Sequence, residues 1–233
     1  MGQYFRAAVL TSFALCLGFN GCALFTTYPD EFTPLTASQA RSALRDIVAA
    51  TNGCMLIKTK ADAVFSYVEN GEKKTRSVDI LYLWKPGAAL RTRIKYLGNP
   101  ILSVLFDGER WYLTDEINNH VTVCSDIGKI RSSDVPDLFF KQLARLPSGW
   151  IHPDVDSYAV ARNEYACRVS SAADGIAQEL IFPVGSPVPS QARISTDDGT
   201  TVKAEFSAPI TNMALTAATF APQLDGYTVK HLD

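Results

Sequence analysis

The alternation of apolar and polar residues along this chain predicts a protein built mainly from antiparallel β-strands. The clearest stretch runs from Leu90 to Asp115 and reads as three consecutive strands. In the first of them, apolar residues face one way and Arg91, Arg93 and Lys95 face the other. One face of this strand is therefore buried or covered by a ligand, and the other face is exposed to solvent. A Gly-Asn-Pro break at 98–100 separates the first two strands.

Similar patterns continue on both sides of this stretch. We expect further strands at 55–68, 76–84, 120–125, 158–163, 166–171, 177–182, 191–195 and 201–207. Turn dipeptides such as Asn70-Gly71, Asp174-Gly175 and Asp198-Gly199 separate neighbouring strands. A short extended segment at 219–229 closes the chain. The pattern gives about ten or eleven strands in one large sheet, and a sheet of that size must curl.

Apolar residues recur at helical spacing in two places. Thr36 and Gln39 form a capping-box pattern at the start of a helix that ends at Asn52-Gly53. A second helix is expected at 133–145, where bulky apolar residues recur before Pro147. Two helices are too few for parallel βαβ units, so the predicted fold class is α+β with a single antiparallel sheet. Either the sheet closes on itself, or a concave apolar surface is left open to a ligand.

Residues 1–21 have the pattern of a targeting segment rather than of a folded element. Arg6 precedes an apolar run at 7–19 that is too short for a membrane-spanning helix. The following Gly21-Cys22 step resembles the lipobox of bacterial lipoproteins, so Cys22 is the expected lipid-attachment site. Cys16 is a second candidate, and an ordinary signal peptide cleaved near Ala23 is the alternative interpretation.

The expected domain organisation follows from this leader. Residues 1–21 would be a lipoprotein signal peptide, 22–34 a lipid anchor and tether, and 35–233 the folded domain. An acylated Cys22 would tether the protein without a transmembrane helix. Ala23 follows the cysteine where an aspartate resembles an inner-membrane retention signal, so the outer membrane is favoured.

Composition and cysteine content narrow the class of protein. The 233 residues are 47% hydrophobic with a formal charge of -2, so the chain can bury a full core and has no electrostatic preference for nucleic acid. Cys54, Cys124 and Cys167 would lie in an oxidising compartment. Their spacing allows one disulfide plus one buried thiol, or three separate thiols.

The sequence contains no recognisable motif for catalysis or cofactor binding. The three histidines, His120, His152 and His231, lie in unrelated contexts, and no zinc-binding, nucleophile-elbow or phosphate-loop pattern occurs. We therefore expect a protein that is not an enzyme and has no metal or cofactor. A hydrolase with dispersed catalytic residues remains as an alternative, and it would need a polar cleft with a perturbed carboxylate or histidine.

Several short motifs occur in a defined order along the chain. They are Trp84 at a strand end, the step Asn99-Pro100-Ile101-Leu102-Ser103, the helix sequence DLFFKQLARLP, and a late strand after Pro189 followed by an Asp198-Gly199 turn. This order resembles the LolA/LolB lipoprotein-carrier family. The resemblance implies a curved half-barrel of about 10–11 antiparallel strands lidded by helices. The Asn-Pro-Ile step and the Cys22 anchor resemble the outer-membrane receptor branch, LolB, most closely.

The resemblance also implies a function. The protein would be an outer-membrane lipoprotein facing the periplasm that binds acyl chains in an apolar cavity and receives or inserts lipoproteins or lipids. Its partners would be these acyl chains, the membrane and a periplasmic carrier protein, and a monomer is expected. Leu97 and Ile101 would form a membrane-insertion loop, unless that loop folds back and buries them. The alternative is a non-transporting envelope sensor or protein-binding module on the same fold.

The expected cavity lining consists of inward-facing residues of the predicted strands and of the second helix. These are Ile57, Ala61, Ala63, Phe65, Tyr82, Trp84, Leu90, Ile94, Leu105, Trp111, Leu113, Phe139 and Leu143. The small Ala61 and Ala63 would leave room for an acyl chain, which gains about 0.8 kcal/mol per buried methylene. Alternatively, all of these residues pack against one another as an ordinary core. Only the excess of sheet over helix favours a cavity.

Overall fold

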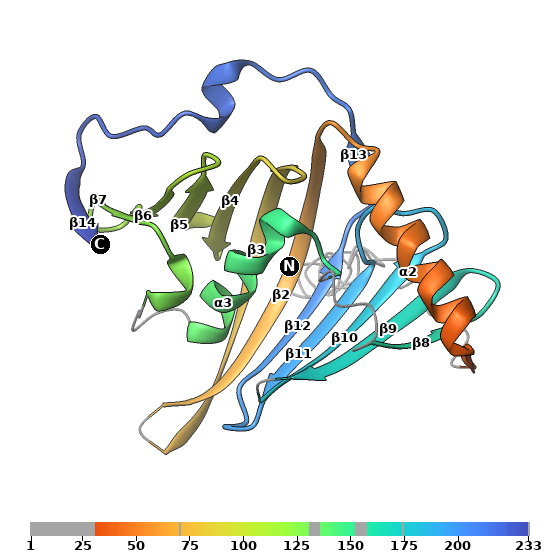
Figure 1. Cartoon of the computed structure of the whole chain (residues 1–233). Helices are drawn as coiled ribbons and strands as arrows, with labels where there is room; N and C mark the ends of the chain where they lie inside the picture. The colour runs from red at the N-terminus through yellow and green to blue at the C-terminus, as the bar shows by residue number, and fades with distance from the viewer. Residues whose placement is uncertain (1–30, 70, 131–135, 152–157, 174, 233) are drawn as a thin grey trace, which may run out of the picture. The chain divides into compact units, whose positions relative to one another are not determined.

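The strands of the folded domain form one continuous sheet in the computed structural model of the chain (Figure 1). The structure describes residues 31–69, 71–130, 136–151, 158–173 and 175–232, which belong to one unit that begins at Glu31. The expected signal peptide, the lipid-attachment site Cys22 and most of the tether lie outside the described residues and stay predictions.

Fourteen strands make up the sheet among the described residues. They are β1 (Thr33–Pro34), β2 (Ile57–Glu69), β3 (Glu72–Lys85), β4 (Ala89–Tyr96), β5 (Asn99–Phe106), β6 (Trp111–Asp115), β7 (His120–Cys124), β8 (Ala159–Arg162), β9 (Ala166–Ala173), β10 (Ile176–Pro183), β11 (Gln191–Thr196), β12 (Thr201–Phe206), β13 (Ile210–Thr211) and β14 (Thr228–Leu232). Their order across the sheet is β1-β8-β9-β10-β11-β12-β2-β3-β4-β5-β6-β7-β14, with β13 also pairing with β2. The long central pair, β2 and β3, therefore joins two halves of the sheet.

The alternation along β2 explains how the sheet presents one face to the core. Buried residues alternate with more exposed ones from Ile57 to Phe65. Ala61 and Ala63 stand opposite Ile80 and Val78 of β3, which are buried on the same face. The strands predicted from alternation are confirmed in these two elements, because half-buried strands leave the period-two pattern that the sequence carries.

The predicted fold class is wrong. We expected an α+β fold with an antiparallel half-barrel of about 10–11 strands lidded by helices, but the structure is mostly β and the large sheet is mixed. β14 runs parallel to β7. β1, β13 and β14 come from segments without clear alternation. β1 and β14 lie at the two edges of the sheet, and β13 pairs with Ile57 and Lys58 of β2, beyond the residues that pair with β12. In each case, unpaired backbone groups of a strand bind an extended neighbour whatever its side chains.

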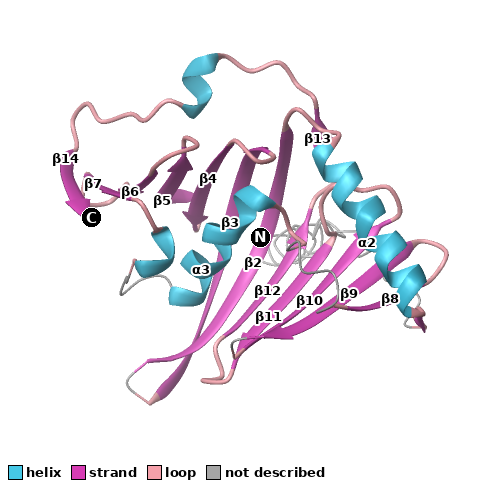
Figure 2. Ribbon diagram, viewed as in Figure 1, coloured by secondary structure: helices cyan, strands magenta, loops and turns pink. Residues whose placement is uncertain are grey.

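In the part of the chain that the structure describes, two α-helices accompany the sheet, α2 (Ala37–Asn52) and α3 (Asp137–Arg145), with short 3-10 turns at Ile127–Lys129, Leu146–Ser148 and Ala217–Phe220 (Figure 2). The predicted start of α2 is confirmed, since the backbone N–H of Thr36 donates to Gln39 Oε1 at 3.0 Å. With 16 and 9 residues, the helices cover too little of a fourteen-stranded sheet to act as the expected lid.

The core lies where the helices meet the sheet. Trp84, Phe140 and Phe182 are the largest side chains that are almost completely buried. Leu44 of α2 and Phe140 of α3 belong to the same apolar cluster as these sheet residues. The apolar stripe of α2 and most of that of α3 are thus buried in one core, which supplies the stability that short helices lack by themselves.

The three cysteines of the described chain do not form a disulfide. Cys54, Cys124 and Cys167 are free thiols, and Cys124 and Cys167 are buried. Burial raises the pKa of both buried thiols. They therefore stay protonated and act as small apolar groups.

The C-terminal segment, residues 207–232, runs from β13 beside β2 to β14 beside β7 (Figure 1). Arg91 Nη1 donates to the carbonyl oxygen of Thr219 at 2.7 Å, and Lys85 Nζ lies 5.1 Å from the centre of the Phe220 ring. These contacts tie the segment to the sheet between its two strands. In the described part of the chain, no helix is long and apolar enough to cross a membrane.

Candidate functional site

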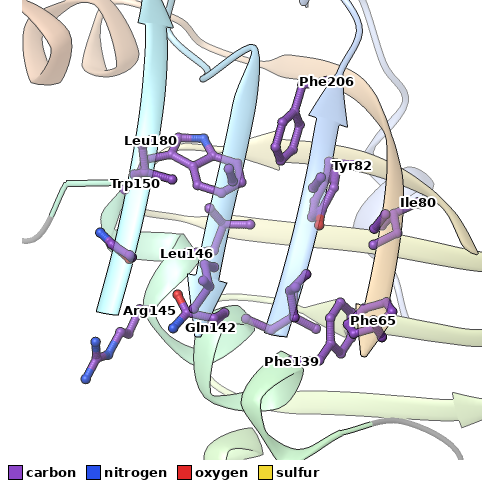
Figure 3. A pocket seen from close by; sticks show the side chains of 18 of the residues that line it. Phe65, Ile80, Tyr82, Phe139, Gln142, Arg145, Leu146, Trp150, Leu180 and Phe206 are labelled. Carbon is purple, nitrogen blue, oxygen red and sulfur yellow. The ribbon is translucent and has the colours of Figure 1, made fainter. Parts of the chain in front are cut away.

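A mostly apolar cavity lies between α3 and the sheet (Figure 3). Its volume is about 80 Å³ in the space open to a water-sized sphere, where a single water needs about 10–15 Å³. The walls come from β2, β3 and β10–β12, from α3 and from the residues that follow α3. They comprise Ala63, Phe65, Ile80, Tyr82, Phe139, Gln142, Leu143, Arg145, Leu146, Gly149, Trp150, Tyr158, Gln178, Leu180, Ala192, Ile194, Val202, Ala204 and Phe206.

A row of alanines forms part of the sheet side of this cavity. Ala192 of β11 stands opposite Ala204 of β12, which stands opposite Ala63 of β2. All three are buried and line the cavity. Because three adjacent strands each contribute only a methyl group here, space remains below α3 that larger side chains would fill.

Aromatic side chains close the cavity on the helix side. Phe139 of α3 meets Phe65 edge to face, with ring centres 5.8 Å apart. Trp150 contacts Phe206 and Tyr82 at 5.1 and 6.3 Å between ring centres. Burial raises the pKa of the Tyr82 hydroxyl, so this group stays neutral. These ring contacts pack α3 and Trp150 against the sheet.

A second hollow, of about 360 Å³, lies beside the cavity near the ends of the β4–β5 and β6–β7 hairpins. It is lined by Phe65, Tyr67, Arg76, Val78, Ile94, Tyr96, Ile101, Leu102, Asp115, Ile117, Asn118 and Pro136. Phe65 contributes to both spaces. Its ring therefore forms part of the wall between the cavity and the hollow.

The hollow opens next to two exposed apolar hairpin tips. Leu97, between β4 and β5, is 82% exposed, and Ile117, between β6 and β7, is 69% exposed. The two hairpins are neighbours, since the backbone N–H of Glu116 donates to the carbonyl oxygen of Ile101 at 3.2 Å. Tyr96 is also exposed and lines the hollow together with Ile117. A small apolar surface thus surrounds the opening of the hollow.

Leu97 is unusual in its backbone conformation. Its φ is 50°, and Gly98 beside it has φ 81°, so the turn is made by these two residues and β5 begins at Asn99. The left-handed region costs an ordinary L-residue roughly 1–2 kcal/mol, and asparagine or glycine is usual there. An exposed leucine in this conformation serves neither the turn nor the core, which indicates a functional role for its side chain.

Asp115 holds the second tip in place. Its Oδ1 accepts hydrogen bonds from the backbone N–H groups of Ile117 and Asn118, at 3.0 and 2.9 Å, and its Oδ2 accepts one from Asn118 Nδ2 at 2.7 Å. Burial alone would raise the pKa of this carboxyl, but the hydrogen bonds from Asn118 and Ile117, together with His120, lower it below its ordinary value.

This lowered pKa gives a pH prediction. Because the pKa of Asp115 is lower in the folded than in the unfolded chain, its stabilising contribution is present above about pH 3.9 and is lost as the pH falls through the folded value. Carboxyl NMR should find Asp115 titrating below the ordinary aspartate range, and Asp115→Asn should make the acid limb of the stability curve shallower. An ordinary or raised pKa for Asp115 would contradict the assigned hydrogen bonds.

The predicted cavity residues lie in four surroundings. Those that line the cavity are Ala63, Phe65, Tyr82, Phe139 and Leu143, and Ile94 lines the hollow. Those that are buried in or packed against the core outside both spaces are Ile57, Ala61, Trp84, Leu90, Trp111 and Leu113. Leu105 stands opposite Arg91, on the other face of the sheet, where it shares a smaller hollow with Leu224.

The two residues of the predicted membrane-insertion loop also differ from each other. Leu97 is exposed at the tip, whereas Ile101 is partly buried, packs against the core and lines the hollow. Sequence reasoning missed Ala192, Ala204 and Trp150 in the cavity. The two alanines lie in strands that alternation predicted, but only their register across three strands shows that they form one row.

Among the described residues, no group of three or more His, Cys, Asp or Glu side chains is placed to hold a metal ion. No protein-family model matches the sequence, and no curated protein matches it.

Solved structures nevertheless resemble this fold. An uncharacterized conserved protein from Thermus thermophilus is 12% identical, with 83% of this chain and 99% of that chain covered and a TM-score of 0.51. A LolA superfamily protein from Nitrosomonas europaea is 8% identical (78% and 97% covered, TM-score 0.45). The Pseudomonas aeruginosa MucA/MucB complex contains a chain that is 13% identical (79% and 61% covered, TM-score 0.42). Only the first score is high enough to show a common fold. The LolA superfamily name is that of the second neighbour, whose score is too low to assign this chain to that superfamily or to a branch of it.

Proposed function

We propose that this protein is an outer-membrane-anchored lipoprotein, facing the periplasm, that binds acyl chains under α3 and receives or inserts lipoproteins or lipids. It would act as a monomer, without covalent chemistry or a cofactor, and a periplasmic carrier would deliver its cargo. The observation that carries the proposal is the apolar cavity over the alanine row of Ala63, Ala192 and Ala204. A lining of this kind offers an acyl chain dispersion contacts and few polar groups that must be desolvated.

The volume of the cavity sets how much of a chain enters. About 80 Å³ accommodates roughly six water molecules, and a methylene group is of similar size. A longer chain would displace α3 and Trp150, or pass Phe65 into the hollow of about 360 Å³. Since each buried methylene contributes about 0.8 kcal/mol, the two spaces in series favour a full acyl chain over a short one.

The exposed tips support a position of the hollow's opening at a membrane. Leu97 and Ile117 lie beside that opening, and each could enter the acyl region of a bilayer. An N-terminal lipid anchor would keep the domain near the membrane surface. The free energy gained by inserting the two tips could therefore be modest and still hold the opening at the bilayer. Cargo would then move between a carrier, the cavity and the bilayer according to its affinity for each.

Filling the cavity tests this proposal. We expect Ala204→Leu to reduce copurifying lipid at least tenfold, because the added carbons occupy the space above the alanine row. Lipid bound to the protein purified from an envelope extract would be identified by native mass spectrometry and lipid extraction. Circular dichroism should show an intact fold, since overpacking costs about 1–3 kcal/mol at most sites.

Ala177→Leu is the matched control. Ala177 is exposed on β10 and does not line the cavity, so the same substitution there should leave bound lipid unchanged. A wild-type protein that carries no lipid and takes up no fluorescent acyl probe would refute the acyl-binding proposal. Equal loss in both variants would show that the effect does not arise in the cavity.

A protein-binding envelope module is the second candidate. The observation that favours it is the small volume of the cavity, about 80 Å³, which Phe139 and Trp150 line with their aromatic contacts to Phe65 and Phe206. Such a module would recognise its partner with its surface and would have no need of an acyl ligand. The lipid analysis described above separates the two functions directly.

A further inference from the structure

The cavity is not uniformly apolar, and its polar groups are unevenly placed. Gln142 and Arg145 are three residues apart on α3, which places them on the same side of the helix, and both line the cavity. The buried Nε2 atom of Gln142 has no hydrogen-bond partner among the described residues. In Figure 3 the Gln142 amide lies beside Leu146, and Arg145 extends outward from the same helix. A buried donor and an exposed cation thus mark one end of the cavity.

The charge at this end has one sign. Among the described lining residues, Arg145 carries the only formal charge, and no carboxylate is present. A buried N–H donor without an acceptor is unfavourable, and binding of a ligand oxygen would satisfy it. A ligand with an anionic or oxygen-rich end therefore fits this part of the cavity, whereas a cationic end would be repelled by Arg145.

A second unpartnered donor does not contribute to this end. The buried Nε1 of Trp150 also lacks a partner among the described residues. In Figure 3, however, its indole lies near Leu180, away from Gln142.

We propose that Gln142 and Arg145 select the polar end of the ligand, so that the cavity prefers an acyl chain ending in a carboxylate or an ester carbonyl. Gln142 Nε2 would donate to the carbonyl or carboxylate oxygen, and Arg145 would add charge attraction where that group is anionic. This inference rests on the proposed acyl binding and names the ligand class. A free fatty acid supplies the carboxylate, and an esterified lipid supplies the carbonyl.

Competition between ligands with the same chain tests the proposal. Native mass spectrometry of the full chain in maltoside micelles would compare dodecanoate, methyl dodecanoate and dodecyltrimethylammonium at equal concentrations. We expect dodecanoate and methyl dodecanoate to exceed the cation by about tenfold or more. Arg145→Gln should reduce the preference for dodecanoate over the methyl ester. Gln142→Met, which keeps the volume of the side chain but removes its donor, should weaken both oxygen-bearing ligands about tenfold.

Lys141→Gln is the control variant, because it removes a neighbouring exposed cation that does not line the cavity. It should keep the wild-type order of ligands. Equal binding of all three ligands to the wild type would overturn the selection by Gln142 and Arg145 and leave acyl binding intact. Binding of none would refute acyl binding and, with it, this inference.

Discussion

Replacing Leu97 with asparagine should weaken binding to lipid vesicles about tenfold or more and, at the same time, stabilise the β4–β5 hairpin. Burying a leucine side chain in a bilayer contributes about 1.5–3 kcal/mol, and asparagine forfeits that contribution. The φ of 50° at Leu97 suits asparagine better than leucine, so the fold should gain about 0.5–1 kcal/mol. Flotation with vesicles and urea denaturation of the chain from Ala23 onward would measure the two effects.

The opposite signs of these two effects make the experiment decisive. A variant that loses membrane binding while gaining stability cannot have lost it by unfolding. Met55→Asn is the control, because Met55 is 77% exposed, close to the 82% of Leu97, but precedes β2 far from the two tips. Ile117→Asn should act in the same direction as Leu97→Asn. Unchanged flotation in both tip variants would show that the tips do not enter the bilayer.

Truncating Phe140 to alanine should lower the free energy of unfolding by about 3–5 kcal/mol. Phe140 is completely buried and contacts Phe139 with ring centres 5.7 Å apart. α3 has only nine residues, so it is too short to be stable without its tertiary contacts. Loss of this anchor should therefore loosen α3, and the wall of the cavity with it. Urea denaturation followed by tryptophan fluorescence would give the change.

Lys141→Ala provides the comparison on the same helix. Lys141 is exposed, and its truncation should change stability by less than about 0.5 kcal/mol. A loss below about 1.5 kcal/mol for Phe140→Ala would mean that the helix is held mainly by its other residues, such as Leu138, which packs in a separate cluster with Ile176 and Ile194.

Phe140 also illustrates what helical periodicity leaves undecided. The predicted apolar stripe of the second helix contained Phe139 and Leu143, which line the cavity, but not Phe140, which is more buried than either. A prediction from an apolar stripe identifies buried residues on one side of a helix only. α3 also contacts the short turn at Ile127–Lys129, so a further side of it is removed from water, and sequence spacing alone could not show this.

The residues that line the cavity could be predicted only in part from the alternation of apolar and polar residues. Alternation correctly placed Ala63 and Phe65 on the inward face of a strand, and both line the cavity. It also placed Leu105 in the lining, although Leu105 faces the other side with Arg91. Leu105 lies in β5, which is an apolar run without alternation. Nothing in the residues of such a run distinguishes one face of the strand from the other.

The sequence by itself determined the local elements: the capped helix from Ala37, the long strands β2 and β3, and a second apolar helix, which was expected at 133–145 and is observed over Asp137–Arg145 in the described residues. Each element depends on contacts between residues that are close in the chain, and the spacing of apolar residues along the sequence therefore reveals it. Only the tertiary structure decided the parallel pairing of β14 with β7, the alanine row across β11, β12 and β2, and the placement of Ile101 and Ile117 around one hollow. These features join distant segments through strand order and register, which backbone hydrogen bonds and the burial of whole faces select together.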